Sequence, residues 1–346
     1  MNQEIYLGGR RIAADAPVFI VAEMSANHLQ DYDRAIEIIH AAKEAGADAI
    51  KLQTYTADTM TVDSDADCFI NKGGLWDGIK EYDLYKQAYT PWEWHAGLME
   101  EAKKCGLLCF SSPFDATAVD FLEELDAPAY KIASYEINDI PLIRRVAKLH
   151  KPVIFATGIA HLEDIERAMN VCREEGNEDV ILLKCVSAYP TPYEDANLTA
   201  MIELYDQFGL PVGLSDHTPG WECDVAATVL GAQVIEKHFT LDKSLPGPDQ
   251  KASLDPAEFA AMVLAVRHAE AALGDGHKHL TASEAPNKAI ARKSIVAARP
   301  IKAGEVFTAE NLLTKRPGDG ISPMLWYTVL GQTAKRDFAE DEKIEL

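Results

Sequence analysis

The sequence has little positive charge and no long apolar run. Lys and Arg number 33 against 55 Asp and Glu, which gives a formal net charge of −22 over 346 residues. Such a surface repels nucleic acid and acidic membranes, because both are bound through basic patches. No window approaches the ~18 uninterrupted apolar residues of a membrane span, and the first residues lack the apolar core of a signal peptide. We therefore expect a cytoplasmic protein with no nucleic-acid or membrane partner.

Paired cysteines and a glycine-rich phosphate turn are also missing. The six cysteines are scattered without CxxC spacing, which predicts small buried thiols in a reducing compartment rather than disulfides or a zinc site. No Gly-rich turn follows an early strand, which argues against a doubly wound nucleotide-binding sheet. With 47% hydrophobic and 25% charged residues, the composition is that of an ordinary globular protein. An anionic ligand would need a local cationic pocket on this acidic chain.

Short β-rich runs alternate with segments of helical periodicity. One such segment places Ala35, Ile38, Ile39 and Ala42 on one stripe and stops at Gly46. The runs are continuous in Val, Ile and Leu, as expected of parallel strands covered on both faces. Their number predicts an α/β fold, a (β/α)8 TIM barrel over residues 1–275. The eight runs span residues 18–23, 47–54, 107–114, 129–134, 152–158, 180–187, 211–218 and 233–240.

Two segments depart from this repeat. Residues 54–91 form too long a connection for a simple loop and are rich in Gly, Asp and aromatic residues, which is typical of a lid or binding loop at the barrel rim. Residues 276–289 are polar and predict a linker. Residues 290–346 change to short strands and turns, which predicts a small β-rich domain that packs on the barrel or on a partner chain.

In a barrel, the polar residues at the carboxyl ends of the strands face the active site. A lysine inside a β run is costly to bury unless it meets an anion. Lys51, Lys131 and Lys184 come from the second, fourth and sixth runs, so we expect them to converge on a phosphate and carboxylate pocket. The alternative is that each lysine pairs with a core carboxylate. The other polar strand-end residues are Glu23, Gln53, Ser111, Ser112, Ser134, Thr157, Ser187, Ser215, Asp216, His217, Glu236 and His238.

Two histidines end neighbouring runs. His217 and His238 close the seventh and eighth strands, and imidazoles are common ligands of catalytic divalent ions. A single strand-end histidine is usually a hydrogen-bonded core residue. Two at adjacent rim positions favour a metal site.

Motifs along the whole chain carry a family resemblance. The barrel region contains EMSANH, KLQTYT, SSPFD, YKIASYEI, LLKCVSAYP, GLSDHT and IEKHFTLD. The tail contains KAGEVFTAENL and KRPGDGISP. Together these strings resemble the sialic acid synthase family, whose members join a TIM barrel to an antifreeze-like (SAF) domain. Other phosphoenolpyruvate-condensing barrels lack the tail. An ice-binding protein would need a flat Thr/Ala face, and the tail offers charge and Pro instead.

The resemblance implies a synthase that condenses phosphoenolpyruvate with an amino-sugar. It implies Mn²⁺ (or Mg²⁺) on His217 and His238, no organic cofactor, and a homodimer in which each SAF domain closes the partner's site. Arg316 of the other chain would then contact an N-acyl group of the sugar. The residues implied for phosphoenolpyruvate are Lys51, Ser112, Lys131, Ser134, Ser187 and Ser215, with Tyr189 nearby. Those implied for the sugar are Gln53, Glu136, Tyr189, Glu236 and Asp249.

Three points stay open at this level. Glu23 or Glu236 could position the attacking water or move its proton. Ser187 stands where many members carry Asn, and Ala156 where a Ser often precedes the Thr-Gly pair. The acceptor divides the motifs: the first half looks most like pseudaminic acid synthases, whereas PGPDQKASLDP and IARKSIVAA look more like N-acetylneuraminate or legionaminate synthases. We favour the pseudaminic precursor, a 6-deoxy di-N-acetylated hexose, because the expected sugar wall is apolar: Phe69, Leu75, Trp76 and Tyr135.

Overall fold

Eight parallel strands close into a barrel in the computed structural model, which describes residues 4–73 and 77–346. Each predicted run contains one strand, so the expected TIM barrel is confirmed. Neighbours in sequence are neighbours in the sheet, and the last strand pairs with the first, Val234 lying opposite Phe19. The strands are β3 (Phe19–Glu23), β4 (Ala49–Thr54), β5 (Leu108–Pro113), β6 (Tyr130–Ile132), β7 (Val153–Ala156), β8 (Val180–Cys185), β9 (Val212–Asp216) and β10 (Val234–His238).

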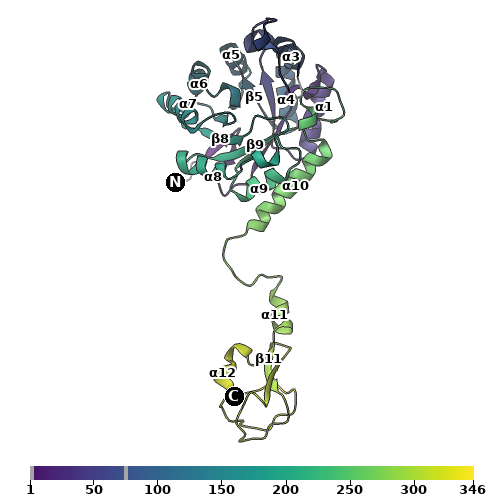
Figure 1. Ribbon diagram of the computed structural model, residues 1–346, viewed down its shortest axis with the longest axis vertical. Helices are drawn as coiled ribbons and strands as arrows, with labels where there is room; N and C mark the ends of the chain where they lie inside the picture. The colour runs from purple at the N-terminus through teal and green to yellow at the C-terminus, as the bar shows by residue number, and fades with distance from the viewer. Residues whose placement is uncertain (1–3, 74–76) are drawn as a thin grey trace. The chain divides into compact units, whose positions relative to one another are not determined.

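A ring of helices surrounds this barrel (Figure 1). Their apolar stripes pack on the outward residues of the strands, as Ile38 and Ile39 do in the first helix. Asp31 caps that helix by accepting from the Arg34 backbone N–H, and Asp255 caps the last one within a capping box. The helices are α1 (Tyr32–Glu44), α4 (His95–Lys104), α5 (Ala116–Glu124), α6 (Ile140–Ala147), α7 (Leu162–Glu174), α8 (Ala200–Phe208), α9 (Glu222–Val229) and α10 (Pro256–Leu273).

The barrel interior is filled at its amino-terminal end by a hairpin that the strand count from sequence did not include. Strands β1 (Ile5–Leu7) and β2 (Arg10–Ile12) pair antiparallel. Ile5, Leu7 and Ile12 are buried among the inward residues of the barrel strands. The Gly8–Gly9 pair has positive φ at both positions, as a tight hairpin turn requires. This plug leaves the carboxyl-terminal end as the open mouth.

In the described part of the long segment 54–91, two short α-helices lie at that mouth. They are α2 (Ala57–Met60) and α3 (Glu81–Ala88). Thr56 caps the first by accepting from the Thr59 backbone N–H. In the described part of α3 no residue is fully buried, so this helix is not part of the barrel core.

The chain divides into two compact units, residues 1–274 and 275–346. The second has its own core, built around Ile295, Phe307 and Phe338, and its strands pair antiparallel. It comprises α11 (Ala285–Ala291), β11 (Ser294–Ala297), β12 (Leu312–Lys315) and α12 (Trp326–Val329). The first of these helices lies across the end of the segment predicted as a linker.

All six cysteines are free. Four are buried as expected, whereas Cys105 is half-buried and Cys68 is exposed, so the expectation of buried thiols fails for these two. Among the described residues, no helix is both long and apolar enough to cross a membrane.

Candidate active site

Alternation along the strands decides which polar side chains face the interior. Phe19 and Val21 belong to the inner cluster, so the next inward position on β3 is Glu23. Ala49 leads in the same way to Lys51, and Ala129 to Lys131. The apolar interior therefore ends at the mouth in a polar layer of Glu23, Lys51, Ser112, Lys131, Cys185, Ser215 and Glu236.

Two lysines and two glutamates form the centre of this layer. Lys131 Nζ donates to both oxygens of Glu236, at 2.8 and 2.9 Å. Lys51 Nζ lies 2.8 Å from Glu23 Oε2 and 3.4 Å from Glu236 Oε1. All four side chains are at most 5% exposed. Buried charges require such pairing, and the cluster places two ammonium groups where an anionic ligand can reach them.

The two glutamates have opposite pKa shifts. Burial alone would raise the pKa of Glu236, but the ammonium groups of Lys131 and Lys51 lower it to about 2. Burial raises the pKa of Glu23 despite the attraction of Lys51, and Glu236 adds to the rise. Two carboxyl groups whose pKa values differ in this way can take different roles, one as a permanent anion and the other as a proton carrier.

His217 and His238 lie together at the rim, with ring centroids 5.2 Å apart. His217 Nδ1 lies 2.8 Å from the Val186 carbonyl oxygen. Because that oxygen can only accept, Nδ1 carries the hydrogen and Nε2 keeps its lone pair. His238 Nδ1 is buried and has no hydrogen-bond partner among the described residues, and burial lowers the pKa of this imidazole well below its usual value. Against the effect of burial, Cys185 and the Val186 carbonyl raise the pKa of His217, so His217 offers Nε2 to a divalent ion in its neutral form, next to His238.

A small cradle lies beside the lysines. The Gly158 backbone N–H donates to Ser134 Oγ at 3.1 Å. A Cβ on Gly158 would lie 2.3 Å from Ser187 Oγ and 2.8 Å from Ser134 Oγ, so any side chain there would displace these hydroxyls. Ser187 Oγ is buried and has no hydrogen-bond partner among the described residues. Hydroxyls gathered around a bare backbone in this way suit an oxyanion such as phosphate.

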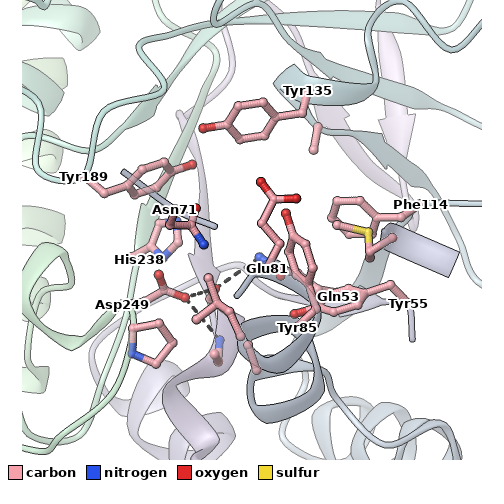
Figure 2. Close-up of a pocket in the computed structure, with 17 residues that line it drawn as sticks. Gln53, Tyr55, Asn71, Glu81, Tyr85, Phe114, Tyr135, Tyr189, His238 and Asp249 are labelled. Atoms are coloured by element: carbon pink, nitrogen blue, oxygen red, sulfur yellow. Dashed lines mark hydrogen bonds between the residues drawn. The ribbon is translucent and has the colours of Figure 1, made fainter. Parts of the chain in front are cut away.

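A larger cavity of about 440 Å³ adjoins this polar layer. Figure 2 shows Tyr135 and Tyr189 on one side, with Tyr55, Tyr85 and Phe114 on another. At its floor, Gln53 Nε2 donates to Glu23 Oε1 at 2.9 Å and to Ser25 Oγ at 3.1 Å. Ser25 Oγ donates in turn to Asp249. This network connects the large cavity to the charged cluster.

The structure brings most of the predicted site residues together. The small inner cavity, of about 50 Å³, is lined by eleven of them. Asp249 lines the large cavity, which Gln53, Tyr189 and His238 share. The eleven are Glu23, Lys51, Gln53, Ser112, Lys131, Ser134, Tyr189, Ser215, His217, Glu236 and His238.

Lys184 does not join the other two lysines. On β8 it follows Val180 and Leu182, which pack with the helix layer, while Cys185 takes the inward position. The expected convergence therefore holds for Lys51 and Lys131 and is wrong for Lys184, because strand alternation turns it outward. The alternative prediction, that each lysine pairs with a core carboxylate, also holds for Lys51 and Lys131.

Four other predicted residues lie off the cavity linings. Thr157 is buried and donates to the Leu183 carbonyl oxygen at 3.0 Å. Ser187 forms part of the cradle described above. Glu136 is half-buried beside the cavity-lining Tyr135, and burial together with Asp139 raises its pKa to about 8. Arg316 is exposed on the second unit.

Several lining residues were missed. Of the expected apolar wall, Tyr135 lines the large cavity and Phe69 does not, while Leu75 and Trp76 lie outside the described residues. Some of the missed residues could have been found from the sequence, because those in the 54–91 segment recur at the spacing of one helical face. The missed residues include Ser25, Tyr55, Met60, Asn71, Glu81, Leu84, Tyr85, Ala88, Phe114 and Pro248.

One further group of potential metal ligands exists among the described residues. His40, Glu101 and Cys105 offer ligand atoms within 4.8 Å of one another. They come from α1 and the end of α4 and line neither cavity. His40 Nε2 and Glu101 Oε1 already form a hydrogen bond of 2.8 Å.

Comparison with known proteins gives this geometry a family. A profile of the NeuB family matches residues 38–278. The chain belongs to the NeuB family. A SAF domain profile matches residues 292–345, so the resemblance inferred from the motifs is confirmed.

Relatives of this NeuB-family chain match it over nearly their full length. A pseudaminic acid synthase of Campylobacter jejuni subsp. jejuni serotype O:23/36 is 50% identical, over 93% of this chain and 94% of its own. A pseudaminic acid synthase of Helicobacter pylori is 46% identical, over 92% and 94%. The crystal structure of an N-acetylneuraminic acid synthetase from Leptospira borgpetersenii superposes with a TM-score of 0.74 and 34% identity, covering 83% of this chain and 95% of that one.

Proposed function

We propose that the chain is a pseudaminic acid synthase, which joins phosphoenolpyruvate to a 6-deoxy, di-N-acetylated hexose. The observation that carries this proposal is the cluster of Lys51 and Lys131 with Glu23 and Glu236, which opens beside two histidines into a cavity of about 440 Å³. A layer with two ammonium groups, next to a sugar-sized cavity, accommodates one small anion and one neutral sugar. The names of the Campylobacter and Helicobacter relatives support the choice of acceptor.

Phosphoenolpyruvate binds the polar layer in this proposal. Lys51 and Lys131 hold its carboxylate and phosphate, and their pairing with the glutamates keeps both ammonium groups in place before it arrives. Ser112 lies 3.4 Å from Lys51 Nζ and adds a hydroxyl donor. The phosphate oxygens occupy the cradle of Ser134 and Ser187. Ser215, which donates to Glu236 Oε1 at 3.1 Å, orients that carboxylate.

The sugar occupies the large cavity, on the side of Gln53, Tyr189 and Asp249. C3 of phosphoenolpyruvate forms a C–C bond to the aldehyde carbon of the open-chain sugar, whose C=O π bond breaks and whose oxygen takes up a proton to become a hydroxyl. The water oxygen adds to C2. The C–O bond to phosphate then breaks as the C2 carbonyl forms, and phosphate leaves with the remaining hydroxyl proton. Glu23 takes the proton of the water, because Glu236 is fully engaged by two lysines and a serine.

A divalent ion, Mn²⁺ or Mg²⁺, is held by His217 and His238 in this proposal. When bound, it polarises the aldehyde oxygen as a Lewis acid. The protein's own part is to fix the His217 ring through the Val186 carbonyl, which keeps Nε2 available. Tyr189 packs against His217 with ring centroids 4.1 Å apart and limits the rotation of that ring.

The second unit covers the mouth of a partner's barrel in a homodimer. Met324 and Tyr327 are each 88% exposed, although both are large and apolar in part, so this face suits a covered state. Residues 271–290 are exposed throughout and tether the unit. Arg316 is exposed and makes no ion pair within the described residues, so it can contact an N-acyl group of the partner's sugar.

The deciding experiment measures kcat/KM with phosphoenolpyruvate and each of two acceptors, the di-N-acetylated 6-deoxy hexose and N-acetylmannosamine. We expect a higher value for the first and release of one phosphate per nine-carbon acid. Such a discrimination is worth about 1–3 kcal/mol per methyl or hydroxyl difference. A higher value for N-acetylmannosamine would contradict the acceptor, and no turnover with either would contradict the synthase assignment.

Removal of metal tests the histidine pair. Dialysis against a chelator should abolish turnover, and Mn²⁺ should restore it. His217→Ala and His238→Ala should each bind Mn²⁺ more weakly, as measured by electron paramagnetic resonance, while the circular dichroism spectrum stays unchanged. Full activity after exhaustive chelation would refute the metal assignment.

Mixing two inactive variants tests the partner contribution. Arg316→Ala leaves the barrel intact, whereas Lys131→Ala disables it and leaves the second unit intact. If the second unit acts on the partner, mixed dimers regain part of the activity. No recovery, despite subunit exchange demonstrated by mass spectrometry, would show that Arg316 acts within its own chain or has no role.

A further inference from the structure

One face of helix α3 lines the large cavity along its whole length. Glu81, Leu84, Tyr85 and Ala88 recur at the i, i+3, i+4 and i+7 spacing of a single helical face, and all four line the cavity. No residue described in α3 is fully buried. Its inner face therefore covers a cavity instead of packing into a core, and a ligand would complete the contacts of that face.

The inner face of α3 joins an apolar wall to one carboxylate. Leu84 lies with Met60 of α2 on the cavity lining, and the two helices pack on each other. The Tyr55 ring fixes the wall in place by edge contacts with Tyr85 and Phe114, at centroid distances of 5.8 and 5.2 Å. The wall is thus preformed and does not need a ligand to order it.

Glu81 is the charged residue on this face. It is half-buried and accepts a hydrogen bond from Thr61 Oγ1 through Oε2, at 3.3 Å. Figure 2 shows its carboxylate pointing into the cavity toward Tyr135. A carboxylate in this position accepts hydrogen bonds, and a neutral N–H or O–H donor is the partner that it selects from a sugar.

We propose that the inner face of α3 determines which acceptor the enzyme uses: Glu81 accepts from the N–H of the second acetamido group, and Leu84 with Met60 contacts the methyl groups. This inference rests on the proposed function and deepens it. A 6-deoxy sugar with two acetamido groups places methyls against the apolar wall. N-acetylmannosamine would place hydroxyls there, and these would lose their water without gaining a partner.

The test compares three variants with the unmodified enzyme, using both acceptors and saturating phosphoenolpyruvate and Mn²⁺. Leu84→Asn should shift the ratio of kcat/KM toward N-acetylmannosamine by about 10-fold or more. Glu81→Gln should lower kcat/KM for the di-N-acetylated acceptor by about 10-fold, because a charged acceptor becomes a neutral one. Asp83→Asn, on the exposed side of the same helix, is the matched control and should change neither value.

Two readouts separate the possible failures. All variants should keep the KM for phosphoenolpyruvate, which reports an intact barrel. Leu84→Ala, which has full helix propensity, replaces Leu84→Asn if that variant is unstable. If the unmodified enzyme prefers N-acetylmannosamine, the proposed function fails. If it prefers the di-N-acetylated sugar and both the Leu84 and Glu81 variants keep that preference, only the role of α3 is overturned.

Discussion

Two buried lysine clusters lie on opposite faces of the same barrel wall. The inner cluster joins Lys51 and Lys131 to Glu23 and Glu236. The outer cluster is centred on Lys237, one residue beyond Glu236 on β10, and strand alternation turns it toward the helices. Both clusters consist of fully buried ion pairs, so burial and charge alone do not distinguish a site from a structural element.

The hydrogen bonds of the ammonium groups do distinguish them. Lys237 Nζ donates to Asp216, to the Thr218 carbonyl oxygen at 2.8 Å and to the Gly220 carbonyl oxygen at 2.7 Å. An ammonium group has three hydrogens, so the outer lysine is saturated. In the inner cluster both bonds of Lys131 go to one carboxylate. Lys51 also has three partners, in Glu23, Glu236 and Ser112, so it is Lys131 that keeps a hydrogen for a ligand, whereas Lys237 does not.

The largest expected effect is a loss of activity in the inner cluster. Lys131→Met should reduce kcat/KM by about 10²–10³-fold, because the bound anion loses one of its two ammonium partners. The fold should persist, since Glu236 still has Lys51 at 3.4 Å and Ser215 at 3.1 Å. Phosphate release and urea unfolding would be measured on the same preparation. If Lys131→Met instead lowers the stability and leaves the activity of the folded fraction unchanged, the two clusters do not differ in role.

The outer cluster should show the opposite pattern. Lys237→Met leaves the buried Asp216 carboxylate without a cation and should lower the free energy of unfolding by about 3–5 kcal/mol. Its folded fraction should keep the KM for phosphoenolpyruvate of the unmodified enzyme. Urea titration gives the first quantity and initial-rate kinetics the second. A large change in that KM without a change in stability would assign Lys237 to the site.

Asp224 offers a pH-dependent test of the outer cluster. Burial raises the pKa of this carboxyl group well above its usual value, and Asp216 adds to the rise despite the attraction of Lys237. A raised pKa in the folded state stabilises the fold below the unfolded value of 3.8, and this contribution is lost as the pH rises above it. Asp224→Asn, which does not titrate, should therefore gain stability over the unmodified enzyme as the pH increases from 4, by about 1.4 kcal/mol for each pH unit until the folded-state pKa is reached. A constant difference between pH 4 and 8 in urea titrations would contradict the raised pKa.

The smallest effect belongs to a surface pair in the second unit. Lys302 Nζ lies 2.7 Å from Asp337, and the two side chains are 78% and 58% exposed. Asp337→Asn should lower the melting temperature only slightly, because solvent and salt screen an exposed pair, and 1 M salt should remove that difference. Thermal melts at low and high salt measure it. A loss as large as that of Lys237→Met would mean that exposure does not weaken the pair.

The barrel could be predicted because its strand-and-helix unit repeats along the sequence. Eight Val/Ile/Leu runs separated by helical segments specify a barrel, and polar residues at the strand ends then mark its mouth. The prediction for Lys184 used only its position at the end of a strand. The alternation of side chains along β8 turns it outward. The hairpin around Gly8 was missed although its glycine pair signalled a turn. Glu81 and Leu84 were missed because a helix in a rim loop has no neighbouring repeat to reveal which face is covered.

The pairing of β10 with β3 has a consequence for folding. It joins the first and last strands of the barrel, so the ring closes only after nearly the whole barrel sequence is available. Such a contact of high sequence separation forms late, because it carries the largest loop-closure entropy. Glu236 and His238 lie on that last strand. Until it docks, Lys131 has no carboxylate partner, so closure of the barrel and completion of the charged centre are one kinetic event.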